Sequence, residues 1–248
     1  MPKFFITDIS DRGTLHKFDK IELTGDNAYH ISKSLRMREG EQVCVSFCDG
    51  IDYTCKIHSF CADSVFVEIT DIAPSTAEPE VKVTLFQALV KGDKMDTIIQ
   101  KAVELGVYEI YPVESERSVV KLDEKAKIKK LERWNKISLE ASKQCGRGII
   151  PKICNILTFE ECAQRLTRFD ASFFCYEEEN EHSLKEILKR KNYSDIGFFV
   201  GSEGGISEKE ALLARELGIP AVTLGKLILR TETAGPAVLS MITYETRL

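Results

Sequence analysis

The 248-residue sequence contains little of what several common protein classes require. It has only four histidines, and none of its eight cysteines forms a Cys-x-x-Cys pair, so we expect reduced cysteines and no bound metal. It has no apolar stretch long enough to span a membrane, and residues 1–8 lack the apolar core of a signal peptide. We therefore expect a cytoplasmic protein that does not associate with membranes.

Two nucleotide-binding signatures are also missing. The segment 200–207, Val-Gly-Ser-Glu-Gly-Gly-Ile-Ser, is rich in glycine but does not continue into the Gly-Lys-Ser/Thr of a phosphate-binding P-loop. It also comes too late in the chain to be the first strand–turn–helix of a dinucleotide-binding domain. A nicotinamide-dependent oxidoreductase is therefore a poor interpretation.

Positive charge is in deficit overall but concentrated locally. The net charge is −5, whereas residues 125–152 contain nine Lys or Arg and only two Glu, which gives this segment a local charge of +7. A solvated helix surface and a contact with a phosphate backbone are both compatible with such a segment.

Residues 1–72 predict a small, closed or nearly closed β-barrel. Alternating apolar residues at 43–47 and 53–57 flank the turn at 48–50, and Asp-Gly between alternating runs is a strong hairpin signal. A third alternating run follows at 65–69, and a short helix is expected at about 26–37. Residues 73–80, which are polar and contain two prolines, are expected to be a linker.

Residues 81–248 predict an α/β domain with a mainly parallel sheet, because expected strands and helices alternate along them. Ser207 and Glu210 have the spacing of a capping box, and Pro236 suits the first turn of a final helix that ends near residue 246. The expected strands are 81–90, 107–113, 171–176, 196–200 and 221–224, and the expected earlier helices are about 93–106, 123–145, 158–166, 183–190 and 207–217.

Two polar corners follow expected strands near the end of the chain, at 201–205 and 230–235. In open α/β sheets, ligands bind where strand ends face helix N-termini. Arg230 stands where a cation is unfavourable unless it meets an anion, which indicates a ligand. Capping of the helix by Thr231 or Thr233 is the alternative reading of this corner, and it remains open.

Two segments contain these corners, Val200-Gly-Ser-Glu-Gly-Gly-Ile-Ser and Leu224-Gly-Lys-Leu-Ile-Leu-Arg-Thr-Glu-Thr-Ala. As a pair they resemble segments of the knotted, SPOUT-type RNA methyltransferases, and most closely of the ribosomal RNA small subunit methyltransferase E family. Three further regions carry the same resemblance, and together they span nearly the whole chain in the family's order. They are Lys91-Gly-Asp-Lys-Met-Asp with Gln100-Lys-Ala-Val-Glu-Leu-Gly-Val, Glu140-Ala-Ser-Lys-Gln-Cys-Gly-Arg147, and His30-Ile-Ser-Lys-Ser-Leu-Arg-Met-Arg-Glu-Gly40.

The resemblance implies a fold, a reaction and an assembly. Residues 1–72 would be a PUA-like RNA-binding barrel, and residues 81–248 a methyltransferase domain tied in a deep trefoil knot, through which the protein would form a homodimer. S-adenosyl-L-methionine would be the methyl donor and would leave as S-adenosyl-L-homocysteine. The acceptor would be N3 of one uridine (position 1498 in the usual 16S numbering) in the ribosomal RNA or the assembled 30S subunit. In-line transfer would need no metal and no covalent intermediate.

The same resemblance, with the chemistry of the reaction, assigns site residues. A guanidinium stabilises the negative charge that develops on the uracil carbonyl oxygens, a role we assign to Arg230, with Glu232 as the candidate base. The expected donor-binding residues are Gly201, Ser202, Glu203, Gly204, Leu224, Gly225, Leu227, Ile228, Leu229, Thr231, Thr233 and Ala234. The expected RNA-binding residues are Lys3, His30, Arg36, Arg38, Lys143 and Arg147.

Three of these positions depart from the family pattern: Ser202 replaces the usual proline, and Leu227 and Lys3 replace the usual arginines. Other functions also remain open. The same fold could methylate a ribose 2′-hydroxyl or a base in transfer RNA. It could also serve as an RNA-binding assembly factor that has lost catalysis, against which the intact Arg230-Thr-Glu-Thr run argues.

Overall fold

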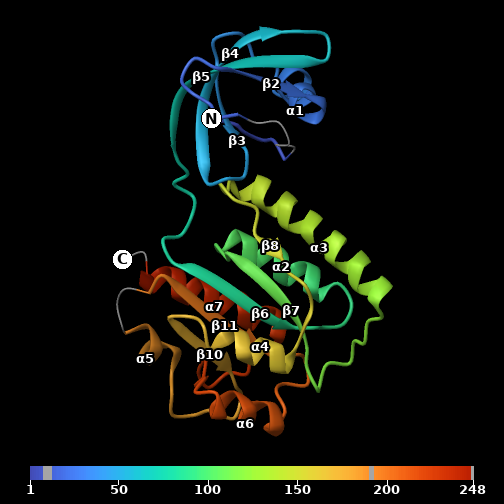
Figure 1. Cartoon of the computed structure of the whole chain (residues 1–248), viewed down its shortest axis with the longest axis vertical. Helices are drawn as coiled ribbons and strands as arrows, with labels where there is room; N and C mark the ends of the chain where they lie inside the picture. Colours follow the sequence, from blue (N-terminus) through green and yellow to red (C-terminus); the bar gives the residue numbers. More distant parts are fainter. Residues whose placement is uncertain (8–12, 190–192, 247–248) are drawn as a thin grey trace. The chain divides into compact units, whose positions relative to one another are not determined.

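The computed structural model describes residues 1–7, 13–189 and 193–246, and the chain divides into two compact units (Figure 1). The first unit comprises Met1–Glu78 and Ser142–Ile150, and the second comprises Pro79–Ala141 and Pro151–Leu248. Residues 142–150, which lie within the range expected for the second domain, therefore group with the first unit. Hydrogen bonds from this stretch to the Glu78 carboxylate give the physical reason.

The first unit is built on a five-stranded sheet in the order β1-β3-β4-β5-β2, with β1 parallel to β3 and the other pairs antiparallel. Its strands are β1 (Lys3–Phe5), β2 (Lys20–Thr24), β3 (Gln42–Ser46), β4 (Ile51–Phe60) and β5 (Ser64–Pro74). The predicted hairpin between β3 and β4 is confirmed, and alternate apolar residues of both strands enter one core. The expected helix is a short α1 (Gly25–Tyr29) that continues as the π-helix η1 (His30–Ser34).

The second unit contains a sheet in the order β12-β10-β11-β6-β7-β8, with β9 beside β7. Every one of these pairings is parallel, which confirms the predicted sheet type. The strands β8 and β9 were not expected, because two-residue strands are too short to show alternation. The bounds are β6 (Lys82–Ala88), β7 (Glu109–Glu114), β8 (Lys152–Ile153), β9 (Leu157–Thr158), β10 (Ala171–Cys175), β11 (Asp195–Val200) and β12 (Ala221–Val222).

Helices cover both faces of this sheet (Figure 1). Phe86 of β6 joins a core cluster with residues of α4 and α6, whereas its neighbours Leu85 and Gln87 lie close to Gly235 of α7. Alternation along one buried strand therefore serves two helical layers. The helices are α2 (Lys94–Glu104), α3 (Glu124–Cys145), α4 (Phe159–Leu166), α5 (Leu184–Leu188), α6 (Glu208–Glu216) and α7 (Thr231–Thr246). Residue 190, the expected end of the helix at 183–190, lies outside the described residues.

Helix α7 begins at Thr231, five residues before Pro236, which the sequence placed in its first turn. The expected placement of Pro236 in the first turn is wrong, because the helix already starts at Thr231 and Pro236 lies inside it. The Arg230 carbonyl accepts the first helical hydrogen bonds, from the amides of Thr233 (2.8 Å) and Ala234 (2.9 Å). Proline has no amide proton, so Pro236 cannot donate the backbone hydrogen bond that another residue would make at its position in the helix. The predicted capping box of Ser207 and Glu210 is confirmed in α6.

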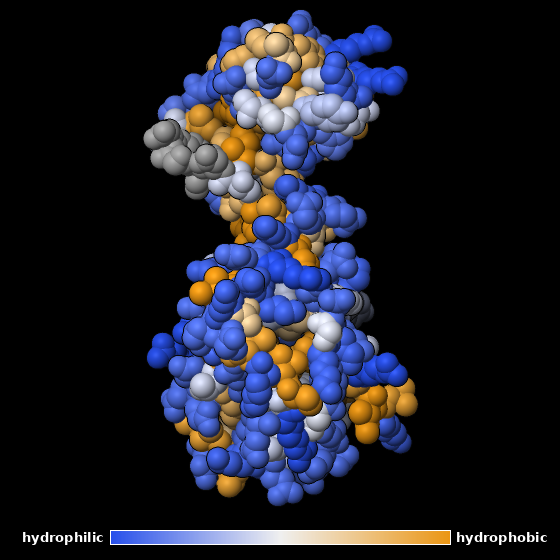
Figure 2. Space-filling view, turned by 90° about the vertical axis from the view of Figure 1, so that its right-hand side faces the viewer, coloured by the Kyte–Doolittle hydropathy of each residue, from blue (hydrophilic) through white to orange (hydrophobic). Residues whose placement is uncertain are grey.

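The face of the second unit that Figure 2 shows is mostly hydrophilic, with separate hydrophobic patches. Among its exposed apolar side chains, Leu227 and Ile228 are 79% and 85% exposed and belong to the segment between β12 and α7. None of the helices in the described ranges is both long enough and apolar enough to cross a membrane.

Candidate functional site

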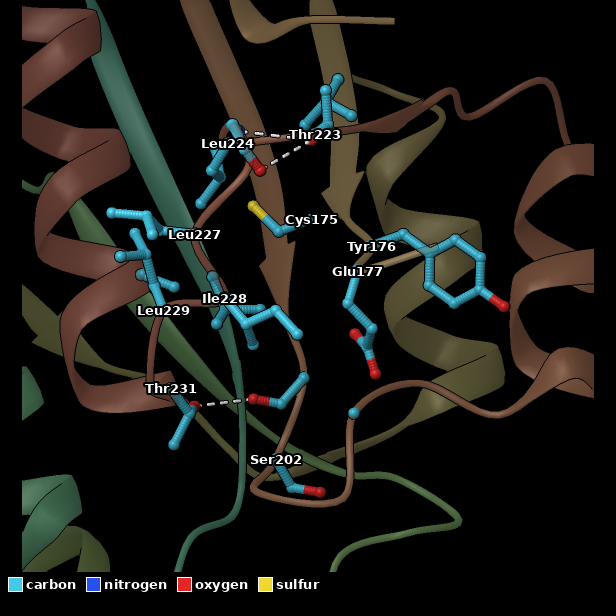
Figure 3. Close-up of a pocket in the computed structure, with 16 residues that line it drawn as sticks. Cys175, Tyr176, Glu177, Ser202, Thr223, Leu224, Leu227, Ile228, Leu229 and Thr231 are labelled. Carbon is cyan, nitrogen blue, oxygen red and sulfur yellow. Dashed lines mark hydrogen bonds between the residues drawn. The ribbon is translucent and has the colours of Figure 1, made fainter. Parts of the chain in front are cut away.

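A cavity lies at the carboxyl ends of three neighbouring strands of the second unit, β10, β11 and β12. Because β10 lies between the other two strands, segments 175–177, 200–205 and 222–234 meet there although they are far apart in the sequence. Figure 3 shows the side chains of these segments around the cavity. This edge of a parallel sheet is where open α/β folds bind ligands.

Nine of the twelve residues predicted to bind the donor line this cavity. The structure therefore brings these nine residues together around one cavity, and their role in binding stays a prediction. The nine are Gly201, Ser202, Leu224, Gly225, Leu227, Ile228, Leu229, Thr231 and Ala234. The remaining three, Glu203, Gly204 and Thr233, are exposed and do not line the cavity.

The Thr231 hydroxyl ties the start of α7 to two strands. It donates to the Gly201 carbonyl oxygen (2.7 Å), a bond marked in Figure 3, and accepts from Gln87 Nε2 (3.0 Å). The side chain is buried, so both bonds are protected from water. Thr231 therefore fixes the position of the cavity wall, and helix capping does not explain its hydroxyl.

The glycine-rich loop after β11 makes a tight turn. The amide of Gly205 donates to the Ser202 carbonyl (3.0 Å), and Gly205 has a φ of 73°, a left-handed conformation that favours glycine. Ser202 is buried, and its hydroxyl has no hydrogen-bond partner among the described residues. The Ser202 side chain is thus buried in this turn without a side-chain hydrogen bond.

Lys94 connects two acidic residues beside the cavity. Its Nζ lies 3.1 Å from Glu203 Oε1 and 3.7 Å from Glu232 Oε2. Burial raises the pKa of Glu203, but hydrogen bonds from its own amide, from Lys94 and from the Lys91 amide outweigh burial and lower it. Glu232, in the first turn of α7, is favourably placed near the positive end of the helix. It does not line the cavity.

Arg230 is exposed and immediately precedes α7. Its guanidinium forms no hydrogen bond or ion pair within the described part of the chain. It does not line the cavity itself, but both of its neighbours, Leu229 and Thr231, do. A cation at a helix N-terminus is unfavourable until an anion approaches, so Arg230 is available to a negatively charged ligand.

All six residues predicted to bind RNA belong to the first unit. His30, Arg36, Arg38 and Lys143 are exposed. Lys3 is partly buried, pairs with Asp52 (2.7 Å) and donates to the Gly146 carbonyl (3.1 Å).

Arg147 is only 3% exposed, and its Nη2 lies 2.6 Å from Glu78 Oε2. Burial raises the pKa of Glu78, but the guanidinium and the amides of Gly148 and Ile149 outweigh it and hold the pKa below its ordinary value. The Arg147 side chain is therefore occupied inside the first unit.

Seven cavity-lining residues escaped the sequence predictions: Cys175, Tyr176, Glu177, Val200, Gly205, Val222 and Thr223. The expected strand at 171–176 was the signal for the first three, since ligands bind at the carboxyl ends of parallel strands. Burial raises the pKa of Cys175 to about 12, so its thiol is neutral at pH 7. No group of three or more His, Cys, Asp or Glu side chains in the described ranges is placed to hold a metal ion.

Comparisons with known proteins agree over most of the chain. Residues 77–243 match the RNA methyltransferase domain family, and residues 23–70 match the RNA methyltransferase PUA domain family. The ribosomal RNA small subunit methyltransferase E of Bacillus subtilis (strain 168) is 36% identical over 231 residues, which cover 91% of this chain and 90% of that protein. The protein of the same name from Aquifex aeolicus is 33% identical over 195 residues, or 78% of this chain and 82% of that one.

A solved structure shares the fold closely. The crystal structure of a ribosomal RNA small subunit methyltransferase E from Neisseria gonorrhoeae, bound to S-adenosyl methionine, superimposes with a TM-score of 0.84 at 31% identity. The alignment covers 99% of this chain and 98% of that one.

Proposed function

The chain belongs to the ribosomal RNA small subunit methyltransferase E family, and we propose that it methylates N3 of a uridine in small-subunit ribosomal RNA with S-adenosyl-L-methionine as donor. The observation that carries the proposal is the cavity at the ends of β10, β11 and β12, where nine of the predicted donor-binding residues meet. The relative from Neisseria gonorrhoeae, which has the same fold, was solved with S-adenosyl methionine bound and supports the choice of donor.

The residues that line the cavity suit this donor. Leucine and isoleucine side chains of 224–229 offer apolar surface for the adenosine and methionine parts, and the glycine-rich loop offers backbone groups. Glu177 is the one charged side chain among the described lining residues, so no lysine or arginine there repels a sulfonium. The bound donor supplies a methyl group that is already activated by its positive sulfur.

Arg230 would stabilise the acceptor during transfer. A uracil N3 must lose its proton before the nitrogen attacks, and negative charge then spreads onto the two flanking carbonyl oxygens. A positioned guanidinium stabilises such charge in the transition state. Arg230 suits this role because no described residue occupies its guanidinium.

Glu232 remains our candidate to accept the N3 proton. Its side chain is half-buried at the start of α7, and Oε2, which is shielded from solvent, has no hydrogen-bond partner among the described residues. Lys94, 3.7 Å away, restrains this oxygen without a short hydrogen bond to it. A carboxylate acts as a general base when the group that it deprotonates comes within hydrogen-bond reach, so the acceptor would have to approach Glu232 beside the cavity.

The first unit would bind the RNA through its exposed basic residues His30, Arg36, Arg38 and Lys143. Phosphate contacts of this kind make binding strongly dependent on salt. The target uridine must be unpaired or extruded, because base pairing hides N3. Homodimerisation through the second unit, the trefoil knot and action in the cytoplasm belong to the same proposal.

Methylation of defined substrates tests the function. Purified protein is incubated with labelled S-adenosyl-L-methionine and either 30S subunits or naked 16S RNA that lack the modification, and nucleosides are identified by mass spectrometry. We expect label in 3-methyluridine. Label in a 2′-O-methylated nucleoside, or in transfer RNA offered alongside, would overturn the acceptor assignment. Donor binding in calorimetry without any transfer would instead indicate an RNA-binding factor.

A further inference from the structure

Glu177 differs from the other acidic residues of its segment. It lines the cavity just after β10, and its carboxylate forms no hydrogen bond or ion pair with another described residue. Glu178, next to it, accepts a hydrogen bond from the Tyr176 hydroxyl (2.8 Å). Glu179 accepts three backbone amides, the shortest from Glu181 (2.8 Å). Glu177 is therefore a carboxylate at the cavity that is not held by another described residue.

Gly205 keeps room for this carboxylate. A Cβ at position 205 would collide with Glu177 Oε1, and the positive φ of Gly205 also disfavours any side chain. Figure 3 shows the Glu177 side chain extending from the end of β10 toward the glycine-rich loop. The absence of a side chain at 205 thus lets the carboxylate rest against this loop at the cavity.

The remaining polar side chains of the cavity are neutral at pH 7. Ser202, Thr223 and Thr231 carry hydroxyls, and burial raises the pKa of both the Cys175 thiol and the Tyr176 phenol. The described lining therefore has a single negative charge and no positive one. A carboxylate without a partner in such a cavity favours a cationic ligand over a neutral one.

We infer that Glu177 distinguishes the methyl donor from its product by charge, an inference that rests on the proposed function. During transfer, a bond forms from uracil N3 to the methyl carbon while the bond from sulfur to that carbon breaks. The electron pair of the broken bond stays on sulfur, and the N3 proton leaves to a base. The sulfur is positive before the transfer and neutral after it, so Glu177 attracts the donor more strongly than the product.

Isothermal titration calorimetry tests this role directly. Wild-type protein, Glu177→Gln and Glu181→Gln are each titrated with S-adenosyl-L-methionine and with S-adenosyl-L-homocysteine. Glu181 is the matched control, because it is exposed on the same segment, lies outside the cavity and loses the same charge. We expect Glu177→Gln to weaken donor binding about three- to tenfold, the range for a partly screened charge pair, and to leave product binding within about twofold.

The salt dependence and the remaining outcomes make the test decisive. The donor preference of the wild type should shrink in high salt, while that of Glu177→Gln should change little. An equal loss for both ligands would overturn the inference, because the carboxylate would then contact a part that both share. Unchanged donor affinity in Glu177→Gln would overturn it as well, with the proposed function intact. A wild type that binds neither ligand would defeat the proposed function itself.

Discussion

The loop after α3 in the first unit and the segment before α7 in the second each carry one arginine, in opposite surroundings. Arg147 is buried against Glu78, whose Oε1 also accepts the amides of Gly148 (2.7 Å) and Ile149 (3.2 Å). Arg230 is exposed and has no partner among the described residues. The ion pair of Arg147 with Glu78 thus holds the first segment in place, whereas the Arg230 guanidinium in the second segment is available to a ligand.

This difference separates two residues that the sequence alone assigned to the same substrate. A buried, paired arginine contributes mainly to the stability of its unit, because its loss strands a carboxylate away from water. An exposed arginine beside a cavity contributes little to stability and can act on a bound anion. The contrast can therefore be tested in two ways, by measuring stability after substitution of Arg147 and turnover after substitution of Arg230.

The largest effect is expected for Arg147→Met. The substitution leaves the Glu78 carboxylate half-buried without its cation, and breaking such a pair costs about 3–5 kcal/mol of the free energy of unfolding. Urea unfolding measures this loss of free energy, and hydrogen exchange at residues 142–150 shows whether it falls on this segment. Arg38→Met, at an exposed position of the same unit, should change stability by less than about 0.5 kcal/mol. If Arg147→Met kept full stability and lost only RNA binding, the contrast between the two arginines would disappear.

Arg230→Ala should lower turnover with little effect on folding. Loss of one charge-stabilising donor costs about 10²–10³ in kcat, whereas donor affinity and unfolding free energy should hardly change. Methylation of 30S subunits gives kcat, and calorimetry gives the affinity for the donor. Arg230→Lys keeps the charge but not the planar fork, so it should retain part of the activity. Full turnover in Arg230→Ala would show that the exposed arginine has no catalytic role.

Acid should weaken the first segment through Glu78. Its pKa in the folded protein lies below the ordinary 4.5, so its stabilising contribution is present above pH 4.5 and is lost as the pH falls through the folded value. Unfolding free energies measured between pH 7 and pH 3 should fall more steeply in the wild type than in Glu78→Gln, which has no carboxyl to protonate. The effect should be smaller than that of Arg147→Met. Parallel curves for the two proteins would mean that Arg147 and Glu78 do not stabilise each other.

The features of this fold that depend on residues close together in the sequence could be predicted. The hairpin around Asp49-Gly50, the capping box of Ser207 and Glu210, and the two polar corners all depend on residues within a few positions of each other. Nine cavity residues could be named in advance because segments 200–207 and 224–234 resemble those of the ribosomal RNA small subunit methyltransferase E family.

Features that depend on distant pairing could not be predicted. The position of β10 between β11 and β12 brings 175–177 to the cavity. The expected strand at 171–176 indicated where this strand ends, but the sequence did not indicate which strands lie beside it. Glu78 and Arg147 are separated by 69 positions, and Gly201 and Thr231 by 30. The start of α7 was misplaced for a similar reason, because proline at 236 gave a local signal while the contact of Thr231 with Gly201 is tertiary.

The smallest predicted effect refines the comparison, because the charges of the second unit are not all free. Lys94 pairs with Glu203 and Glu232, and partly exposed pairs each contribute about 0.2–1 kcal/mol. Lys94→Met should therefore lower kcat/KM only about two- to tenfold, and Lys94→Arg should recover most of it. Lys101→Met, which removes a pair with Glu104 on the same helix, is the matched control and should leave activity unchanged. A loss of kcat/KM above about a hundredfold that arginine does not rescue would mean that Lys94 takes part directly in the reaction. Arg230 would then not be the only cation beside the cavity that acts on the substrate.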